Sequence, residues 1–272
     1  MGKLLFIGAG NMGQAIINGI LQKGQYKKDE IFIYEVNLQT KNSVIENFGV
    51  KEYSKIDNSI NEFDVIILAV KPQIFNNFGL DAAMSAIPQF LTKNQTIVSI
   101  MAGVSIKKME DFFGKDSNII RIMPNTPSLI GQGMSVISAS HNVSKDKIDV
   151  VKNIFESIGL VEFIEEKHLD AVTALSGSGP AYVFMFIESL IQGGILCGLP
   201  KSFAEKLAVQ TVVGSAMMVD GKKPIEELRH QVTSPAGTTI EAVSVLESKG
   251  FRSAIIEAIR AASNRSKELG KQ

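Results

Sequence analysis

The chain has 272 residues, enough for one large domain or two of ordinary size. Its 28 basic and 28 acidic residues give a formal net charge of zero, which excludes a strong field for nucleic acid or for an acidic membrane surface. One cysteine, Cys197, cannot form a disulfide framework, so we expect a reducing, cytoplasmic location. The three histidines are far apart and lack metal-ligand spacing, so we expect no metal site.

The chain alternates short apolar runs with helical segments as far as about residue 165. A helix is expected after Gly10, another after Asn37, which can cap it, and a third near residues 146–158. Buried strands that alternate with helices predict a parallel sheet covered on both faces. We expect strands at residues 3–7, 31–34, 64–70, 96–100, 118–122 and 134–140.

No convincing strand follows residue 165. The sequence therefore predicts an α/β protein with a Rossmann-type dinucleotide-binding domain at residues 1–164 and an all-helical domain at residues 165–272. The stretch 175–199 has one formal charge, Glu188, and could span a bilayer by length. Its glycines, Pro180 and Gln192 favour instead a helix buried inside a domain or between subunits. Helices are expected at residues 180–197, 202–219, 239–248 and 251–269.

Three glycines follow the first strand in the sequence Gly-Ala-Gly-Asn-Met-Gly. In a strand–loop–helix setting, Gly8 permits a tight turn, Gly10 leaves room for a pyrophosphate, and Gly13 lets the helix lie close to the sheet. The first N–H groups of the helix would stabilise the phosphate charge. The alternative is a structural turn with no ligand. The expected cofactor contacts here are Gly8, Ala9, Gly10, Asn11, Met12 and Gly13.

Two further strand ends belong to the predicted cofactor site. Glu35 lies 22 residues after Gly13, where an acid bonds the adenosine ribose hydroxyls. Because Glu35 would repel a 2′-phosphate, the residues favour NADH over NADPH, unless Glu35 is only an exposed acid at a strand end. After the third strand, Ala69, Val70, Lys71 and Pro72 are expected to give backbone and packing contacts, although Lys71 could instead be catalytic.

Four segments together resemble the pyrroline-5-carboxylate reductase family. They are VKP (70–72), RIMPNTP (121–127), SGSGPAYVF (176–184) and SPAGTTIEAV (234–243). The resemblance implies reduction of 1-pyrroline-5-carboxylate to L-proline with NADPH or NADH, the last step of proline biosynthesis. It also implies a helical domain that binds substrate and forms a homodimer or larger oligomer. Two departures are Ala236, where the family usually has glycine, and Glu35-Val36, where it often has a polar residue and arginine.

The segment SPAGTTIE predicts a substrate-binding helix start. Thr238 and Glu241 match a capping box, which would place the N–H groups after Gly237 around a carboxylate, with Ser234 adding a hydroxyl. The resemblance implies that the Thr239 hydroxyl lies at the substrate nitrogen and helps to deliver the proton. The alternative is a capped helix without a ligand.

The segment SGSGP predicts a helix break. Pro180 cannot continue a helix without losing a hydrogen bond, and the adjacent glycines leave room for a ring, so we place Ser178 in the substrate site. A kink between packed helices is the alternative. Arg121 and Asn125 are expected to be structural.

These motifs contain no general base, which argues against oxidation of a hydroxy acid. A protonated imine accepts hydride without one. The sequence therefore predicts an imine oxidoreductase acting on a small molecule, 1-pyrroline-5-carboxylate. A reductase of a related cyclic imine and a non-catalytic nucleotide-binding regulator are the alternatives.

Overall fold

The computed structural model describes residues 2–77, 79 and 83–270. Its contacts divide the chain into two compact units, one up to Ser178 together with the C-terminal stretch from Ala262, the other Gly179–Ala261. Residues 165–178 belong to the first unit by these contacts; Leu169 there is buried. The functional domain boundary after residue 164 stays a prediction.

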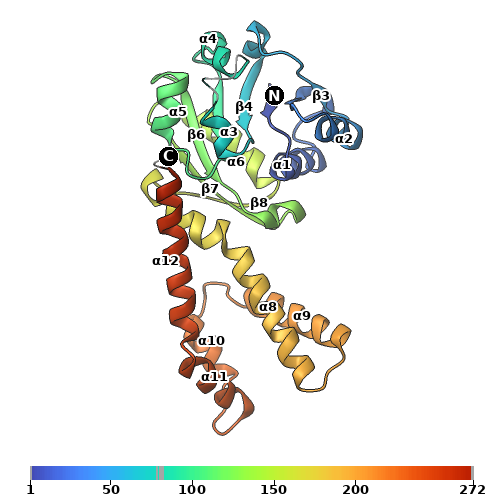
Figure 1. The fold of residues 1–272 in the computed structure, drawn as a ribbon, viewed down its shortest axis with the longest axis vertical. Helices are drawn as coiled ribbons and strands as arrows, with labels where there is room; N and C mark the ends of the chain where they lie inside the picture. The colour runs from blue at the N-terminus through green and yellow to red at the C-terminus, as the bar shows by residue number, and fades with distance from the viewer. Residues whose placement is uncertain (1, 78, 80–82, 271–272) are drawn as a thin grey trace. The chain divides into compact units, whose positions relative to one another are not determined.

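The first unit is built on one sheet whose strand order is β3-β2-β1-β4-β5-β6-β7-β8. Neighbouring strands are parallel except β6 and β7, which are antiparallel. Figure 1 shows the sheet between helices. The strands are β1 (Lys3–Ile7), β2 (Ile31–Tyr34), β3 (Lys51–Glu52), β4 (Phe63–Leu68), β5 (Thr96–Ser99), β6 (Asn118–Met123), β7 (Gly133–Ala139) and β8 (Gly159–Phe163).

The sheet differs from the expected one in two respects. The prediction that it is wholly parallel is wrong at β7, because the link from β6 contains only a short 3₁₀ turn, Thr126–Ile130, and no long helix that could carry the chain back across the sheet. Strands β3 and β8 were not expected. Both lie at the sheet edges, where β8 has mostly exposed or half-buried residues instead of a continuous apolar run.

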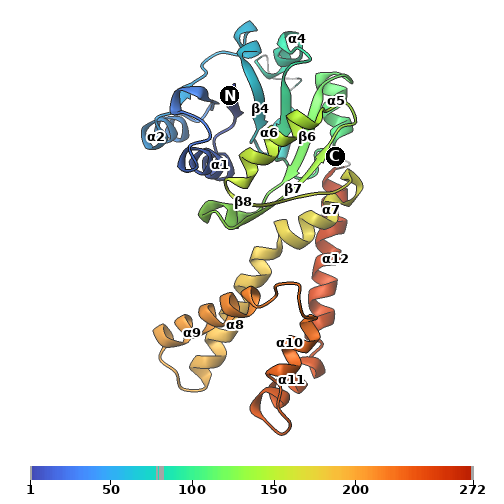
Figure 2. The ribbon, with the colours of Figure 1, turned by 180° about the vertical axis from the view of Figure 1, so that it is seen from behind.

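Helices cover both faces of the sheet and form two separate cores. Helices α1, α2 and α6 contribute to one core, for example through Ile16, Val44 and Phe155. Helices α3, α4 and α5 contribute to the other, for example through Phe75 and Met109. Figures 1 and 2 show the two faces in turn. The helices are α1 (Asn11–Gln22), α2 (Leu38–Phe48), α3 (Pro72–Phe75), α4 (Ile87–Phe90), α5 (Ile106–Phe113), α6 (Lys145–Glu156) and α7 (Leu169–Val172).

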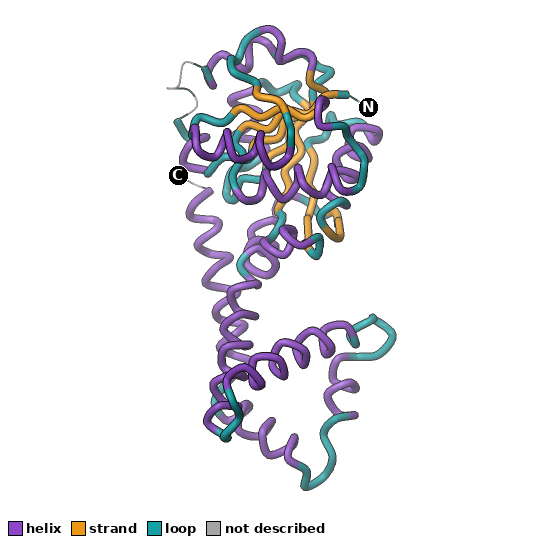
Figure 3. Tube along the Cα trace, turned by 90° about the vertical axis from the view of Figure 1, so that its right-hand side faces the viewer, coloured by secondary structure: helices purple, strands orange, loops and turns teal. Residues whose placement is uncertain are grey.

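The second unit contains only helices and loops among its residues, as Figure 3 shows. Helices α8 and α9 pack closely where Gly194 meets Ala204; a Cβ on Gly194 would lie 3.2 Å from the Ala204 Cβ. Helix α10 was not expected. The helices are α8 (Gly179–Leu196), α9 (Lys201–Met217), α10 (Ile225–Gln231), α11 (Thr238–Ser248) and α12 (Phe251–Gly270), the last of which ends in the first unit.

The apolar side chains of α8 are not buried within the chain. Phe184 is 61% exposed and Met185 66%, and no residue of α8 is classed as buried. Burial of this stretch inside a domain is therefore wrong, whereas burial between subunits stays a prediction. By length and composition alone, the helical stretch Glu166–Leu196 could cross a membrane.

The expected helix break before Pro180 is a widened helical turn. Residues Thr173–Gly177 form a π-helix, and the Ser178 N–H donates to the Thr173 carbonyl at 2.8 Å. Because Pro180 has no N–H and its ring would clash with a carbonyl in a regular helix, the wider turn lets α8 begin at Gly179. The predicted break is therefore a π-helical turn with a bend at Ser178, and its role in making room for a ring stays a prediction.

Candidate functional site

The glycine loop connects β1 to α1 at the carboxyl edge of the sheet. Gly8 has φ +89°, and a Cβ there would lie 2.8 Å from both the Ala69 carbonyl oxygen and Val70 Cγ1. A Cβ on Gly13 would lie 3.3 Å from the Gly8 oxygen. Gly8 therefore allows a tight turn and Gly13 a close helix, as expected.

Gly10 differs from its two neighbours. A Cβ added there would meet nothing within 4 Å, so glycine is not required by contacts inside the protein. Gly10 is the N-cap of α1 and has an extended backbone, and no side chain caps the helix. The first N–H groups of α1, beginning with Asn11 and Met12, thus have no side-chain cap at this helix start. This loop fits the pyrophosphate of a dinucleotide.

Glu35 ties the end of β2 to the glycine loop. Its Oε2 accepts a hydrogen bond from the Ala9 N–H at 2.9 Å, and its Oε1 accepts one from the Asn37 N–H at 2.8 Å. Glu35 is half-buried, so it is not a free acid at a strand end. Asn37 in turn caps α2 by accepting from the Thr40 N–H at 2.9 Å, as expected. The hydrogen bond from Ala9 to Glu35 was not expected from the sequence. The sequence signal that could have indicated it is an acidic residue at the end of the strand that follows the glycine loop.

The segment after β4 lies against the same loop. Strand β4 ends at Leu68, two residues earlier than expected, and the Ala69 N–H still donates to the Ile7 carbonyl at 2.8 Å. Lys71 is extended and caps α3, whose first residue is Pro72. Because β1 lies between β2 and β4, these contacts bring Glu35, the glycine loop and Ala69–Pro72 together at one sheet edge. The Lys71 side chain is exposed. This exposure is compatible with the predicted backbone contact, which does not need a buried side chain.

Two residues of the RIMPNTP segment have structural bonds. Arg121 pairs with Glu166 at 2.9 Å, and the same Glu166 oxygen accepts from the Ile106 N–H at 2.7 Å. Asn125 accepts from the Met134 N–H at 2.9 Å and donates to the Ser176 carbonyl at 3.1 Å. Asn125 therefore holds the loop after β6 to the π-helical turn.

The predicted substrate segment is a tight turn followed by α11. The N-cap is Gly237, and no side chain caps the helix, so the expected capping box of Thr238 and Glu241 is wrong. The turn already directs the chain into the helix, since the Gly237 N–H donates to the Ser234 carbonyl at 3.1 Å. The N–H groups of the first turn therefore have no side-chain acceptor at this helix start.

The turn places Ser234 directly beside Gly237. A Cβ on Gly237 would lie 2.4 Å from the Ser234 hydroxyl oxygen, so a larger residue there would displace that hydroxyl. Ala236 has φ +54°, the left-handed conformation that favours glycine. It is the non-glycine residue with positive φ in the described part of the chain. The alanine that departs from the family pattern thus occupies a strained position.

The remaining substrate candidates have different surroundings. Thr239 is half-buried in the first turn of α11, and Thr238 beside it is exposed. Ser178 is half-buried at the end of the π-helical turn in the first unit. The structure thus brings the cofactor candidates together in the first unit and groups Ser234, Gly237, Thr238 and Thr239 in the second. Among the residues described, no group of three or more metal-binding side chains occurs.

Comparisons with known families match both parts of the chain. Residues 166–269 match the model described as pyrroline-5-carboxylate reductase dimerisation, and residues 3–103 match NADP oxidoreductase coenzyme F420-dependent. A pyrroline-5-carboxylate reductase from Synechocystis is 41% identical, over 99% of both chains. One from Escherichia coli is 40% identical, over 99% of this chain and 98% of that one. The chain belongs to the pyrroline-5-carboxylate reductase family.

Solved structures agree with this assignment. A pyrroline-5-carboxylate reductase from Coxiella burnetii has a TM-score of 0.89 at 36% identity, covering 100% of this chain and 99% of that one. A pyrroline carboxylate reductase from Plasmodium falciparum, solved with NADP bound, has a TM-score of 0.87 at 34% identity, covering 99% and 98%. The family, the two-part fold and an oxidoreductase with a nicotinamide cofactor are confirmed, as is homo-oligomerisation.

Proposed function

We propose that this protein reduces the C=N bond of 1-pyrroline-5-carboxylate to give L-proline. The carrying observation is the whole-chain likeness at about 40% identity to enzymes of that name. The open space at Gly10 supports it, since it lies at an uncapped helix start on the sheet edge where such folds bind dinucleotides.

The chain's part in binding the cofactor is to hold its phosphates. The N–H groups of Asn11 and Met12 stabilise the pyrophosphate, and Gly10 allows its close approach. Glu35 orients the loop through the Ala9 N–H. Ala69–Pro72 form the adjacent wall. The bound nicotinamide supplies the hydride for the imine carbon.

The start of α11 binds the substrate carboxylate. Its first N–H groups have no side-chain cap, and the Ser234 hydroxyl lies beside them. The Thr239 hydroxyl lies at the imine nitrogen and helps to deliver its proton, while Ser178 remains a substrate-binding candidate in the first unit. Protonation makes the imine a strong electrophile, so the reaction needs no strong base from the protein.

We also propose a preference for NADH. Glu35 carries a negative charge at the end of β2, and both its oxygens already accept backbone N–H bonds that hold it there. A 2′-phosphate at this strand end would be repelled. Lys41 of α2 is paired with Glu52 at 2.7 Å.

Assembly through the helical unit and a cytoplasmic location complete the proposal. The exposed apolar faces of α8 and α9 support the first, and the single cysteine supports the second.

The test is the rate of NADH and NADPH oxidation with 1-pyrroline-5-carboxylate and, separately, with its six-membered homologue. We expect the highest kcat/KM with the five-membered imine and NADH. A higher value with the six-membered ring would favour the related imine reductase. Tight NADH binding without turnover of either imine would favour a non-catalytic regulator.

A further inference from the structure

A cavity lies at the amino edge of the sheet, opposite the glycine loop. It has a volume of about 520 Å³, within the range of small-molecule sites, roughly 300–1,000 Å³. It is bordered by the beginnings of three strands, at Gly2, Asp64 and Thr96, and by helix α6. All of its lining residues belong to the first compact unit.

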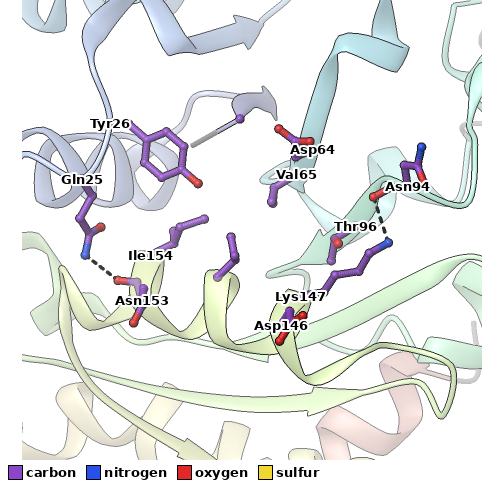
Figure 4. Close-up of a pocket in the computed structure, with 12 residues that line it drawn as sticks. Gln25, Tyr26, Asp64, Val65, Asn94, Thr96, Asp146, Lys147, Asn153 and Ile154 are labelled. Carbon is purple, nitrogen blue, oxygen red and sulfur yellow. Dashed lines mark hydrogen bonds between the residues drawn. The ribbon is translucent and has the colours of Figure 1, made fainter.

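Tyr26 is a buried polar residue of this cavity. The residue is only 7% exposed, and Figure 4 shows its phenol group extending into the cavity. In the part of the chain that the structure describes, its hydroxyl makes no hydrogen bond. Burial, followed by the nearby charges of Asp64 and Glu30, raises the pKa of Tyr26 to about 12, so the hydroxyl remains protonated and neutral.

Two further hydrogen-bond acceptors border the same cavity. The Asp64 carboxylate lies over Gly2, since a Cβ there would be 1.0 Å from Asp64 Oδ2, and it has no ion-pair partner among the described residues. Gln25 donates to the Asn153 carbonyl at 2.8 Å, whereas its buried Oε1 has no partner. Gln25 Oε1 is closed to solvent, so the Asp64 carboxylate and the Tyr26 oxygen are the two acceptors open to the N–H donors of a ligand's ammonium group.

The cation already in the cavity has its own partners. Lys147 Nζ donates to the carbonyls of Lys93 and Asn94, both at 2.9 Å. Burial lowers the pKa of Lys147, and Asp64 partly opposes that shift. Asp64, Asp146 and Lys147 together give the ionisable lining a formal charge of −1, which favours a cation over an anion.

The lining also includes three apolar side chains, those of Val65, Val150 and Ile154. We propose that this cavity binds a primary ammonium compound with a compact apolar body, its nitrogen at Asp64 and Tyr26 and its body on these three side chains. The site is separate from the reductase site and does not depend on the proposed function.

The test uses three probes of one shape, measured by calorimetry on the full chain. They are cyclohexylmethylamine, cyclohexylmethanol and cyclohexanecarboxylate. We expect saturable binding of the amine and at least tenfold weaker binding of the other two. Saturating NADH should leave the amine affinity unchanged. No saturation by about 10 mM amine, equal affinity for the carboxylate, or displacement by NADH would overturn the proposal.

Variants locate the site. Asp64→Asn should weaken amine binding at least tenfold, while Asp111→Asn, an exposed acid on α5, should not change it. Tyr26→Phe removes only the hydroxyl and should weaken binding about threefold, which keeps the proposal testable if Asp64→Asn folds poorly. Unchanged binding in a folded Asp64→Asn or in Tyr26→Phe would overturn it.

Discussion

The first compact unit builds two cores of buried large apolar side chains within one chain, whereas the helical unit leaves many of its own exposed. Phe6, Ile16 and Phe155 are fully buried in the first unit, but Phe184 and Met217 in the helical unit are 61% and 78% exposed. Exposed apolar surface of this kind marks an interface. The sheet unit thus builds its cores from its own chain, and we expect the helical unit to cover its apolar faces with a second copy.

The largest effect should come from a charge on the helical surface. Phe184→Asp would place a carboxylate in the proposed interface on both copies. Burying each unpaired carboxylate would cost about 2 kcal/mol or more of association free energy. That cost corresponds to roughly a thousandfold weaker dimer. Sedimentation equilibrium would measure it. Leu38→Asp, at an equally exposed position in the first turn of α2, should leave assembly unchanged; an unaltered Phe184→Asp oligomer would contradict the comparison.

Gly10→Val should separate cofactor binding from stability in the first unit. The added side chain meets open space, so the fold should persist, but it would occupy the position proposed for the pyrophosphate. We expect the NADH dissociation constant to rise by more than about 100-fold. Fluorescence titration and thermal unfolding would measure the two quantities.

Gly8→Ala should instead lower stability, because its Cβ would lie 2.8 Å from the Ala69 oxygen. Normal NADH affinity in Gly10→Val would remove the loop from the site.

Thr239→Val tests chemistry in the helical unit. If the hydroxyl bonds the charged imine nitrogen, its loss costs about 1.5–3 kcal/mol, so kcat/KM should fall by roughly 10- to 150-fold. The NADH dissociation constant should change much less. Thr238→Val, one residue earlier and exposed, is the matched control. Equal turnover in the two variants would leave Thr239 without a catalytic role.

Glu35→Gln tests the link between cofactor choice and loop position. The two carboxylate oxygens of Glu35 accept hydrogen bonds from the N–H groups of Ala9 and Asn37. The glutamine amide keeps one of these acceptor oxygens and removes the negative charge. We expect the ratio of kcat/KM for NADPH to that for NADH to rise about fivefold, or about 1 kcal/mol. Glu46→Gln, an exposed acid on α2, should not change that ratio. An unchanged ratio in Glu35→Gln would refute the proposed NADH preference.

The smallest expected effect concerns the strained turn before α11. Ala236→Gly should stabilise the protein by about 1 kcal/mol, because the alanine has φ +54°. Ala242→Gly, within α11, should destabilise it by about 1 kcal/mol. Urea denaturation compares the two. Loss of stability in both variants would mean that the turn tolerates alanine without strain.

The sequence alone determined the elements whose signals are local. Strands β1 and β2 have the predicted bounds because continuous apolar runs end at turn residues, and Asn37 and Gly49 mark the two ends of α2. The order of the four motifs was enough to predict the family. Glycine at positions 8, 10 and 13 predicted a loop at a strand end, since that pattern depends on local backbone geometry.

Only the tertiary structure decided features that depend on distant neighbours. The antiparallel direction of β7, the edge strand β8 and the bond from Ala9 to Glu35 join residues far apart in the chain. The capping box at Thr238 failed because the turn at Ser234 supplies Gly237 as the cap. The apolar stretch in α8 shows the same limit: its composition gives its hydrophobicity, but only packing decides whether its own chain or another covers it.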